Sequence, residues 1–221
     1  MELSLFLEYG PALLKGLMNT ILCWIVGAAG GIVLGFLIAV AMHYGPKGLR
    51  LILRAYIEVI RGTPFLVQLF ILYYGGPYIG LRLDPVPAGI TGLIIYGSPY
   101  YAEIFRAGLQ AVPTGLVEAG HAIGMPETTI LRRIILPVLL VSSVPPLTNF
   151  SIILTKETAI LSIVTVPELL YQVQTMSAET FAFFEATFAL AMFYWALVEL
   201  ISLAGRKLEQ RANRFLGKES N

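Results

Sequence analysis

The sequence has little charge for its length. Of its 221 residues only 13% are Asp, Glu, Lys or Arg, whereas 57% are hydrophobic and the mean hydropathy is +0.76. A soluble domain carries about 25% charged residues, so the composition argues against an ordinary soluble domain and indicates a membrane protein. The formal net charge of +1 indicates no particular class of partner.

Other missing features exclude further classes. The single cysteine, Cys23, cannot form an intrachain disulfide. The two histidines, His43 and His121, lie far apart and lack Cys or His neighbours, so we expect no metal site. No G-x-x-x-x-G-K-[ST] motif is present, so the chain has no P-loop of its own. An H-E-x-x-H motif is also missing, which argues against an intramembrane enzyme.

Five apolar stretches predict transmembrane helices, because about 20 predominantly apolar residues span a bilayer. Since the acidic start lacks a basic n-region, we expect the first stretch to be a span rather than a signal peptide. Its GAAGGIVLG segment is rich in small residues, which allow close helix packing. The third stretch is a weaker candidate for a span, because Gly and Pro recur in it. The fourth is expected to be broken by Pro137, Pro145 and Pro146. The five stretches are about 16–42, 56–74, 87–105, 134–154 and 181–203.

Basic residues predict the orientation. Five spans place the termini on opposite sides, and with the N-terminus outside almost all Lys and Arg fall on the inner side, as the positive-inside rule requires. The outer segments then hold only Lys15 and Arg82. The inner ones hold Lys47, Arg50, Arg54, Arg106, Arg132, Arg133, Arg206, Lys207, Arg211, Arg214 and Lys218.

A polar module at about 113–133 therefore faces the cytoplasm, between the third and fourth spans. Thr114 is a candidate helix N-cap, Glu118 suits the first turn and Gly124 suits a helix stop. Pro126 then fits the first turn of a second helix. From these residues alone the module is either a solvated hairpin or a docking surface for a soluble partner.

The spacing in this module resembles a known signature. Permease subunits of binding-protein-dependent ABC importers carry Glu-Ala-Ala, three residues, Gly, nine residues and Ile-x-Leu-Pro. The matching residues here are Glu118, Ala119, Gly120, Gly124, Ile134, Leu136 and Pro137. Gly120 departs from the pattern, since Ala is usual there and Gly lowers helix propensity by about 1 kcal/mol.

Three more segments are similar to the polar amino acid permeases within that family. They are YIEVIRGTPFLVQL at 56–69, YAEIFRAGLQAVP at 101–113 and LTKET at 154–158. The resemblance covers about 16–211 and includes four blocks in the expected order. It does not distinguish between glutamine, glutamate, arginine, histidine, cystine or amino-acid-like solutes.

The resemblance implies an all-α fold of the type I ABC importer permease in a bacterial inner membrane, with the N-terminus periplasmic and the C-terminus cytoplasmic. The short cytoplasmic helix would dock on one of two separate ATPase subunits, which would bind ATP and Mg, while this chain would bind no cofactor. A second permease, either a copy or a paralogue, would complete the pathway. A periplasmic or lipid-anchored binding protein would deliver substrate, and no nucleic acid is expected.

The main alternative to an ABC permease comes from another class of transport protein. A self-sufficient secondary transporter or channel would leave the cytoplasmic module unexplained, and the sequence shows no inverted hydropathy repeat. The proposed ATPase contact comprises Glu118, Ala119, Gly120 and Gly124, although capping and helix termination also explain these residue types.

Candidate residues for the substrate pathway cluster around the end of the fourth span. Lys156 and Glu157 are ionisable residues beside an apolar run, where such groups usually pair or face a cavity. Neighbours on a helix do not face each other, so each is expected to have its own partner, or Lys156 to extend to the interface. The other candidates either line the pathway or satisfy backbone freed by the prolines. They are Asn149, Ser151 and Thr155.

The second span carries a candidate gate or subunit contact. Glu58 and Arg61 are three residues apart and so are expected to pair on one helix face. Thr63 and Pro64 are expected to kink the helix, because proline removes a backbone donor and clashes with the preceding turn. The tyrosines are expected as anchors at the membrane interface. These are Tyr73, Tyr74, Tyr78, Tyr100 and Tyr101.

Overall fold

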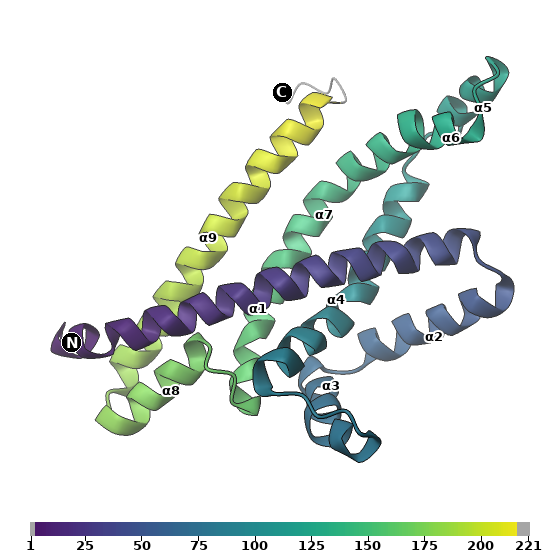
Figure 1. The fold of residues 1–221 in the computed structure, drawn as a ribbon. Coiled ribbons are helices and arrows are strands. Elements are labelled where there is room, and N and C mark those ends of the chain that lie inside the picture. The colour runs from purple at the N-terminus through teal and green to yellow at the C-terminus, as the bar shows by residue number, and fades with distance from the viewer. Residues whose placement is uncertain (1–2, 216–221) are drawn as a thin grey trace.

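The computed structural model describes residues 3–215, and that part of the chain is helical almost throughout, with no strand (Figure 1). The α-helices are α1 (Leu3–Tyr44), α2 (Lys47–Gly62), α3 (Phe65–Phe70), α4 (Pro85–Gln110), α5 (Thr114–Ala122), α6 (Glu127–Ile130), α7 (Leu136–Glu157), α8 (Leu169–Thr180) and α9 (Phe183–Phe215). Short π segments, η1 (Ile71–Gly75) and η3 (Leu131–Ile135), and 3-10 segments, η2 (Gly76–Ile79) and η4 (Thr158–Val164), extend some of them.

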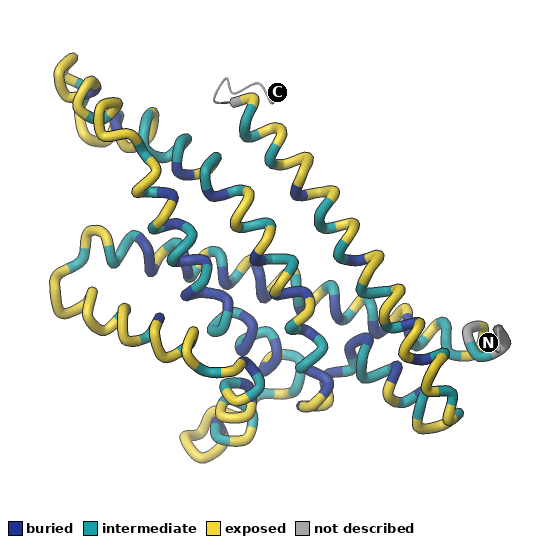
Figure 2. Tube along the Cα trace, turned by 180° about the vertical axis from the view of Figure 1, so that it is seen from behind, coloured by how far each residue is buried: buried dark blue, intermediate teal, exposed yellow. Residues whose placement is uncertain are grey.

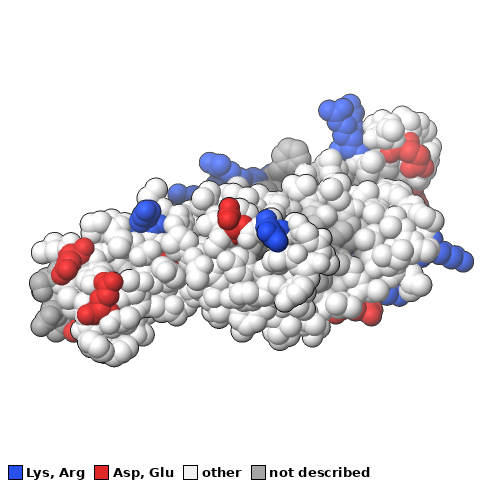
Figure 3. Space-filling view, turned by 60° about the horizontal axis from the view of Figure 1, so that its bottom comes forward, with Lys and Arg blue, Asp and Glu red and all other residues white. Residues whose placement is uncertain are grey.

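Three helical stretches between residues 3 and 215 are long and apolar enough to cross a membrane. They are Leu7–Tyr44, Glu127–Val164 and Phe183–Arg214, and a bent pair of helices makes a fourth candidate. The predicted third span lies in α4, a continuous helix of 26 residues that does not pass the same test. Its recurring Gly and Pro lower its hydropathy. One face of the molecule carries few charged side chains, as expected of a surface in contact with lipid (Figure 3).

The predicted second span, 56–74, is not one straight helix. Lys47–Gly62 and Phe65–Ile79 meet at an angle of 109°. The break falls at Thr63 and Pro64, as predicted. A proline disfavours helical angles in the residue before it, and Thr63 has extended angles of φ −116° and ψ 143°.

Side chains satisfy the backbone that this break exposes. The Gln68 amide nitrogen donates to the carbonyl oxygens of Ile60 and Thr63, at 2.8 and 3.0 Å. The Thr63 hydroxyl donates to the Val59 carbonyl at 2.9 Å. Inside a membrane an unpaired backbone group is costly, so these bonds stabilise the bend.

The predicted break in the fourth span is wrong. Pro145 and Pro146 lie inside α7, which continues from Leu136 to Glu157, and Pro137 lies in its first turn. A proline in the first turn costs little because that backbone nitrogen has no helical partner. Prolines further along are tolerated in membrane helices when neighbouring groups compensate.

Small residues allow α1 and α4 to cross at close range. A Cβ on Gly35 would lie 2.7 Å from the Ser98 carbonyl oxygen and 2.9 Å from the Ala102 nitrogen. Gly27 and Gly30 meet side chains of α4 in the same way. The predicted role of the small-residue segment is therefore confirmed. Figure 2 shows the buried residues gathered along this crossing, whereas α2 and the α5–α6 tip are mainly exposed.

A second core joins the beginning of α1 to α8 and α9. The fully buried carboxylate of Glu168 caps α8 by accepting bonds from the backbone nitrogens of Leu170 and Tyr171, at 2.9 and 2.7 Å. Thr20 of α1 accepts a bond from the Leu169 nitrogen at 3.0 Å. Helix α8 was not predicted, because it is too short and polar to resemble a span.

Candidate functional site

The polar module forms a helical tip at the far ends of α4 and α7 (Figure 1). Helix α5 begins at Thr114, and its N-cap is Pro113, which makes no side-chain cap. The prediction of Thr114 as the N-cap is therefore wrong by one residue. Proline suits this place because its fixed φ favours the extended conformation that precedes a helix.

The four residues predicted to contact an ATPase do not share one surface. Glu118 and Ala119 are exposed, whereas Gly120 is buried inside the hairpin. A Cβ on Gly120 would lie 3.1 Å from Ile130 and 3.2 Å from Ile134. The departure from Ala at this position therefore lets α5 pack closely on the following segment.

Gly124 ends the helix, as predicted. Its φ of +74° is in the left-handed region that glycine adopts without strain. Its nitrogen donates to the His121 carbonyl at 2.9 Å, and the Met125 nitrogen donates to the Gly120 carbonyl at 3.0 Å. These bonds satisfy the last carbonyls of α5 and so fix the direction in which the chain leaves the tip.

The fold brings the two histidines to one cavity. His43, His121 and Glu118 are among the residues that line a space of about 400 Å³ between the end of α1, the end of α4 and the tip. His121 also lies 3.7 Å from Glu127. No group of three or more His, Cys, Asp or Glu side chains within residues 3–215 is placed to hold a metal ion.

A second cavity, of about 590 Å³, lies between α2, α4 and α7. Arg61 of the predicted gate and Asn149 of the predicted substrate pathway both line it. The Arg61 guanidinium carbon lies 5.3 Å from the centre of the Tyr100 ring, and Tyr100 stacks on Phe150 at 4.6 Å. The cavity therefore has the Arg61 guanidinium over the Tyr100 ring, and it is also lined by the exposed amide of Asn149.

The predicted pair between Glu58 and Arg61 is not formed, as no ion pair joins them in the described chain. Glu58 is exposed, and Arg61 lies over Tyr100 instead. An exposed pair three residues apart contributes only about 0.2–0.5 kcal/mol. An aromatic face contributes about as much or more and also allows the planar guanidinium to stack.

Two of the predicted pathway residues face the protein interior. The Ser151 hydroxyl lies 3.0 Å from the Tyr101 hydroxyl, and the Ser151 carbonyl accepts bonds from Trp24 and Thr155, both at 2.9 Å. Thr155 is fully buried. These groups join α1, α4 and α7 and do not line the cavity beside Arg61. Tyr101 is also fully buried, so the prediction that it anchors the chain at the membrane interface is wrong.

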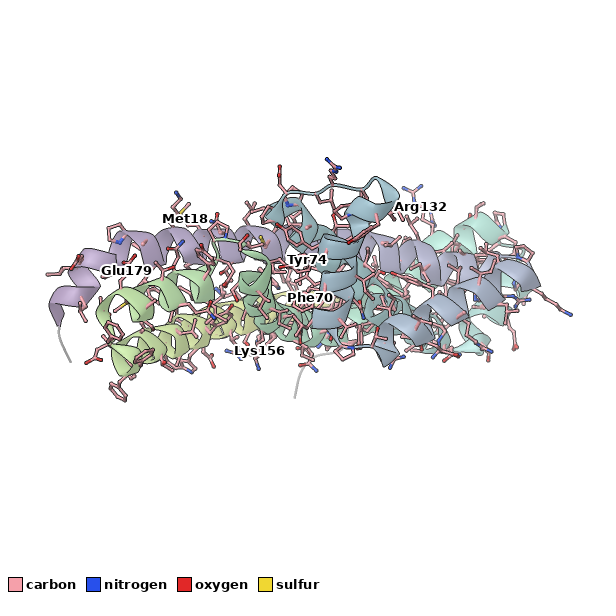
Figure 4. The ribbon with its side chains drawn as sticks, turned by 90° about the horizontal axis from the view of Figure 1, so that it is seen from below. Met18, Phe70, Tyr74, Arg132, Lys156 and Glu179 are labelled. Atoms are coloured by element: carbon pink, nitrogen blue, oxygen red, sulfur yellow. The ribbon has the colours of Figure 1, made fainter. Side chains whose placement is uncertain are left out.

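Lys156 and Glu157 point in different directions, as predicted. Lys156 is exposed and lines a groove of about 390 Å³ with Tyr194 and Trp195, between α7 and α9. Glu157 is half-buried. In Figure 4 Lys156 lies between Glu179, toward one end of the molecule, and Arg132, toward the other.

Sequence reasoning missed three contributors to the cavity beside Arg61. Tyr100 is predicted as an interface anchor, and neither Phe150 nor Glu103 has a predicted role, yet all three line the cavity. Glu103 binds Arg106 through both carboxylate oxygens, with a shortest distance of 2.7 Å. The three-residue spacing of Glu103 and Arg106 was a signal for that pair. No sequence signal indicated the stack of Tyr100 on Phe150, because the two rings come from different helices.

Comparison with known families agrees with this arrangement. The model of a family described as "Binding-protein-dependent transport system inner membrane component" matches residues 31–214. The L-cystine transport system permease protein TcyB of Bacillus subtilis (strain 168) is 36% identical over 216 residues, covering 96% of this chain and 91% of that protein. The glutamine transport system permease protein GlnP of Escherichia coli (strain K12) is 36% identical, covering 91% and 93%.

Solved structures show the same fold. The chain is similar to one in the crystal structure of an amino acid ABC transporter with histidines, with a TM-score of 0.89 and 33% identity, covering 96% of this chain and 99% of that one. A chain of the MetNI methionine ABC transporter in an inward-facing conformation has a TM-score of 0.75 at 23% identity, covering 90% and 95%. The second likeness concerns the fold alone.

Proposed function

The chain belongs to the family of binding-protein-dependent transport system inner membrane components, and from this premise we propose that it is the permease subunit of an ATP-driven importer for polar amino acids. The observation that carries the proposal is the α5–α6 tip. It extends from a multi-pass membrane protein without a P-loop and exposes Glu118 and Ala119. A surface of this kind is what a separate ATPase would need.

The proposed topology follows from charge and from the helices. Five spans place the N-terminus in the periplasm and the C-terminus and tip in the cytoplasm of a bacterial inner membrane. The bent α2–α3 pair serves as the second span and α4 as the third. Basic residues favour this orientation by the positive-inside rule. The aromatic-rich turn after α3 then faces the periplasm, where Phe70 and Tyr74 form an edge-to-face pair at 5.5 Å.

The tip transmits the cycle of the ATPase to the spans. Two ATPase subunits bind ATP and Mg, and one of them holds Glu118 and Ala119 in a cleft. Gly120 packs the tip onto Ile130 and Ile134, which precede α7. Movement of the tip therefore reaches α7, whose Asn149 lines the cavity beside Arg61. This contact is a direct mechanical connection between the ATPase surface and the cavity.

The cavity beside Arg61 supports the substrate class. Arg61 has no carboxylate ion pair within the described chain, and a guanidinium matches the geometry of a substrate carboxylate. Asn149 supplies an exposed amide for hydrogen bonding. The named relatives transport glutamine and cystine, both of which carry an α-carboxylate. A second permease, either a copy or a paralogue, closes the pathway, and a periplasmic or lipid-anchored binding protein delivers the substrate.

Reconstitution with the partner ATPase, the second permease and the binding protein tests both parts of the proposal. We expect ATP-dependent uptake of a radiolabelled amino acid into vesicles, with competition by unlabelled polar amino acids that identifies the substrate class. Uptake by the purified chain without ATPase or ATP would instead indicate a secondary transporter or channel.

A substitution on the tip tests the coupling role. Ala119→Arg places a bulky charge on an exposed position, so we expect normal insertion but loss of ATP-driven uptake. Gln210→Arg adds the same charge to an exposed position at the end of α9 and serves as the matched control. Normal coupling in the Ala119→Arg importer would show that the ATPase does not bind this surface.

A further inference from the structure

A third cavity, separate from the one beside Arg61, lies where α1 ends and α2 and α4 pass each other. It has a volume of about 560 Å³. Four of the residues that line it are permanently cationic, namely Lys47, Arg50, Arg54 and Arg106. We propose that this cavity binds the headgroup of an anionic phospholipid from the cytoplasmic leaflet. The proposal rests on the orientation given above, in which these helix ends face the cytoplasm.

The positive charge in the cavity exceeds the negative charge near it. Glu103 is bound by Arg106 through both oxygens, and it also interacts electrostatically with Arg54. Neither Lys47, Arg50 nor Arg54 forms an ion pair with any part of the chain that the structure describes. Several cations converging on one cavity repel one another, and an anion placed between them removes that repulsion.

The spacing along α2 brings these cations to one side. Lys47, Arg50 and Arg54 are three and four residues apart, so they occupy one face of the helix. All three line the cavity. The start of α2 is also nearby, where the helix dipole favours an anion. Helix periodicity therefore gathers the charges at one site rather than spreading them around the helix.

Exposed apolar side chains of α2 favour a lipid over a soluble anion. Leu51, Ile52 and Val59 of α2 are 70%, 68% and 61% exposed. Such side chains belong in contact with acyl chains, and Leu51 itself lines the cavity. A helix with a basic face and an apolar face is the arrangement that lies at the membrane interface. A phospholipid offers an anionic headgroup to the basic residues and acyl chains to the apolar ones, whereas inorganic phosphate can bind only the basic residues.

Lipid retention by the purified full-length chain tests the proposal. The chain is reconstituted in nanodiscs of phosphatidylcholine with a minor fraction of phosphatidylglycerol, extracted again, and the phospholipid that stays bound is counted by native mass spectrometry. We expect phosphatidylglycerol to be retained in preference to phosphatidylcholine. Each basic residue near an anionic surface contributes about fivefold, so replacing three is expected to lower this preference on the order of 100-fold.

Three variants make the result specific. Lys47→Gln, Arg50→Gln and Arg54→Gln together should lose the preference. Lys47→Arg, Arg50→Lys and Arg54→Lys together keep the charge and should retain it. The control replaces one Lys and two Arg that are exposed near the end of α9, and it should also retain the preference. Its changes are Lys207→Gln, Arg211→Gln and Arg214→Gln.

Several outcomes would overturn the proposal. These are equal retention in all three variants, an equal loss in the α9 control, or a loss in the variant that keeps the charge. Displacement of phosphatidylglycerol by inorganic phosphate at comparable concentration would show that the site takes a soluble anion. Lipid retention is read on the purified chain without ATPase, so its failure is distinct from a failure of ATP-driven uptake.

Discussion

The crossing of α1 and α4 gives the sharpest test of the fold, through Gly35→Ala. The new Cβ would lie 2.6 Å from the Tyr101 Cβ and 2.7 Å from the Ser98 carbonyl oxygen. Ordinary contact begins at 3.4 Å, and the opposing atoms belong to the backbone or to a Cβ, which cannot rotate away. The two helices must therefore separate locally by about 0.7 Å, which is overpacking of a kind that costs about 1–3 kcal/mol.

A smaller gain opposes this cost. Alanine is about 1 kcal/mol more favourable than glycine within a helix, so the net loss of unfolding free energy is about 0–2 kcal/mol. For a chain of this size that corresponds to a melting temperature lower by up to about 8 °C. Thermal unfolding in detergent, followed by loss of the monodisperse chromatographic peak, measures the shift.

Gly10→Ala is the matched control, since it lies in the same helix and nothing lies within 4 Å of its Cβ position. It should leave the melting temperature unchanged or raise it slightly. Both variants gain the same helix propensity, so a Gly35→Ala protein as stable as the Gly10→Ala protein would refute the close crossing.

Two further sites give predictions of a different kind. Glu168→Ala removes the acceptor for two N–H groups at the start of α8, which should cost about 1–3 kcal/mol in thermal unfolding; an unchanged melting temperature would mean that the cap is dispensable. Glu168 lies outside the spanning stretches, after Val164, and burial raises the pKa of its carboxyl from an ordinary value of 4.5 to about 7. The folded state therefore binds this proton more tightly than the unfolded state. The resulting stability is full below pH 4.5 and is lost as the pH rises through about 7. Glu168→Gln should flatten this dependence, and the same pH profile in that variant would assign it to another group. Gly124→Lys forces a side chain into a left-handed conformation at φ +74°, a strain of about 1–2 kcal/mol, and places a charge at the tip. We expect an inserted permease whose partner ATPase hydrolyses ATP without uptake, and normal uptake per ATP would remove Gly124 from the coupling surface.

The bend at Pro64 and the packing of α1 were predictable because their causes are local. Proline restricts the residue before it wherever it occurs, and a run of small residues allows close approach whichever helix is opposite. The continuous path of α7 through Pro145 and Pro146 was not predictable. A proline ends a helix or is tolerated according to the groups packed around it, which the sequence does not reveal.

The candidate site divides in the same way. The tip was recognisable, since the spacing of Glu118, Ala119 and Gly124 matches the signature. That Gly120 faces Ile130 and Ile134, while Glu118 faces outward, follows from how the hairpin folds back. Arg61 contacts Tyr100 rather than Glu58 because α4 packs against α2, and this packing is known only from the tertiary structure.

By itself, the sequence determined that this is a polytopic membrane protein. It also supplied the basic bias from which the orientation is predicted, a polar module between two predicted spans, and the absence of a P-loop motif. These properties depend on composition and on spacing within one segment. Tertiary structure alone decided which polar groups meet. It separated Asn149, in a cavity with Arg61, from Ser151 and Thr155 in the core, and it gathered the cations of α2 and α4 around one space. The physical reason is that a helix sets which residues share its own face, whereas the residues opposite that face are chosen by packing between helices distant in sequence.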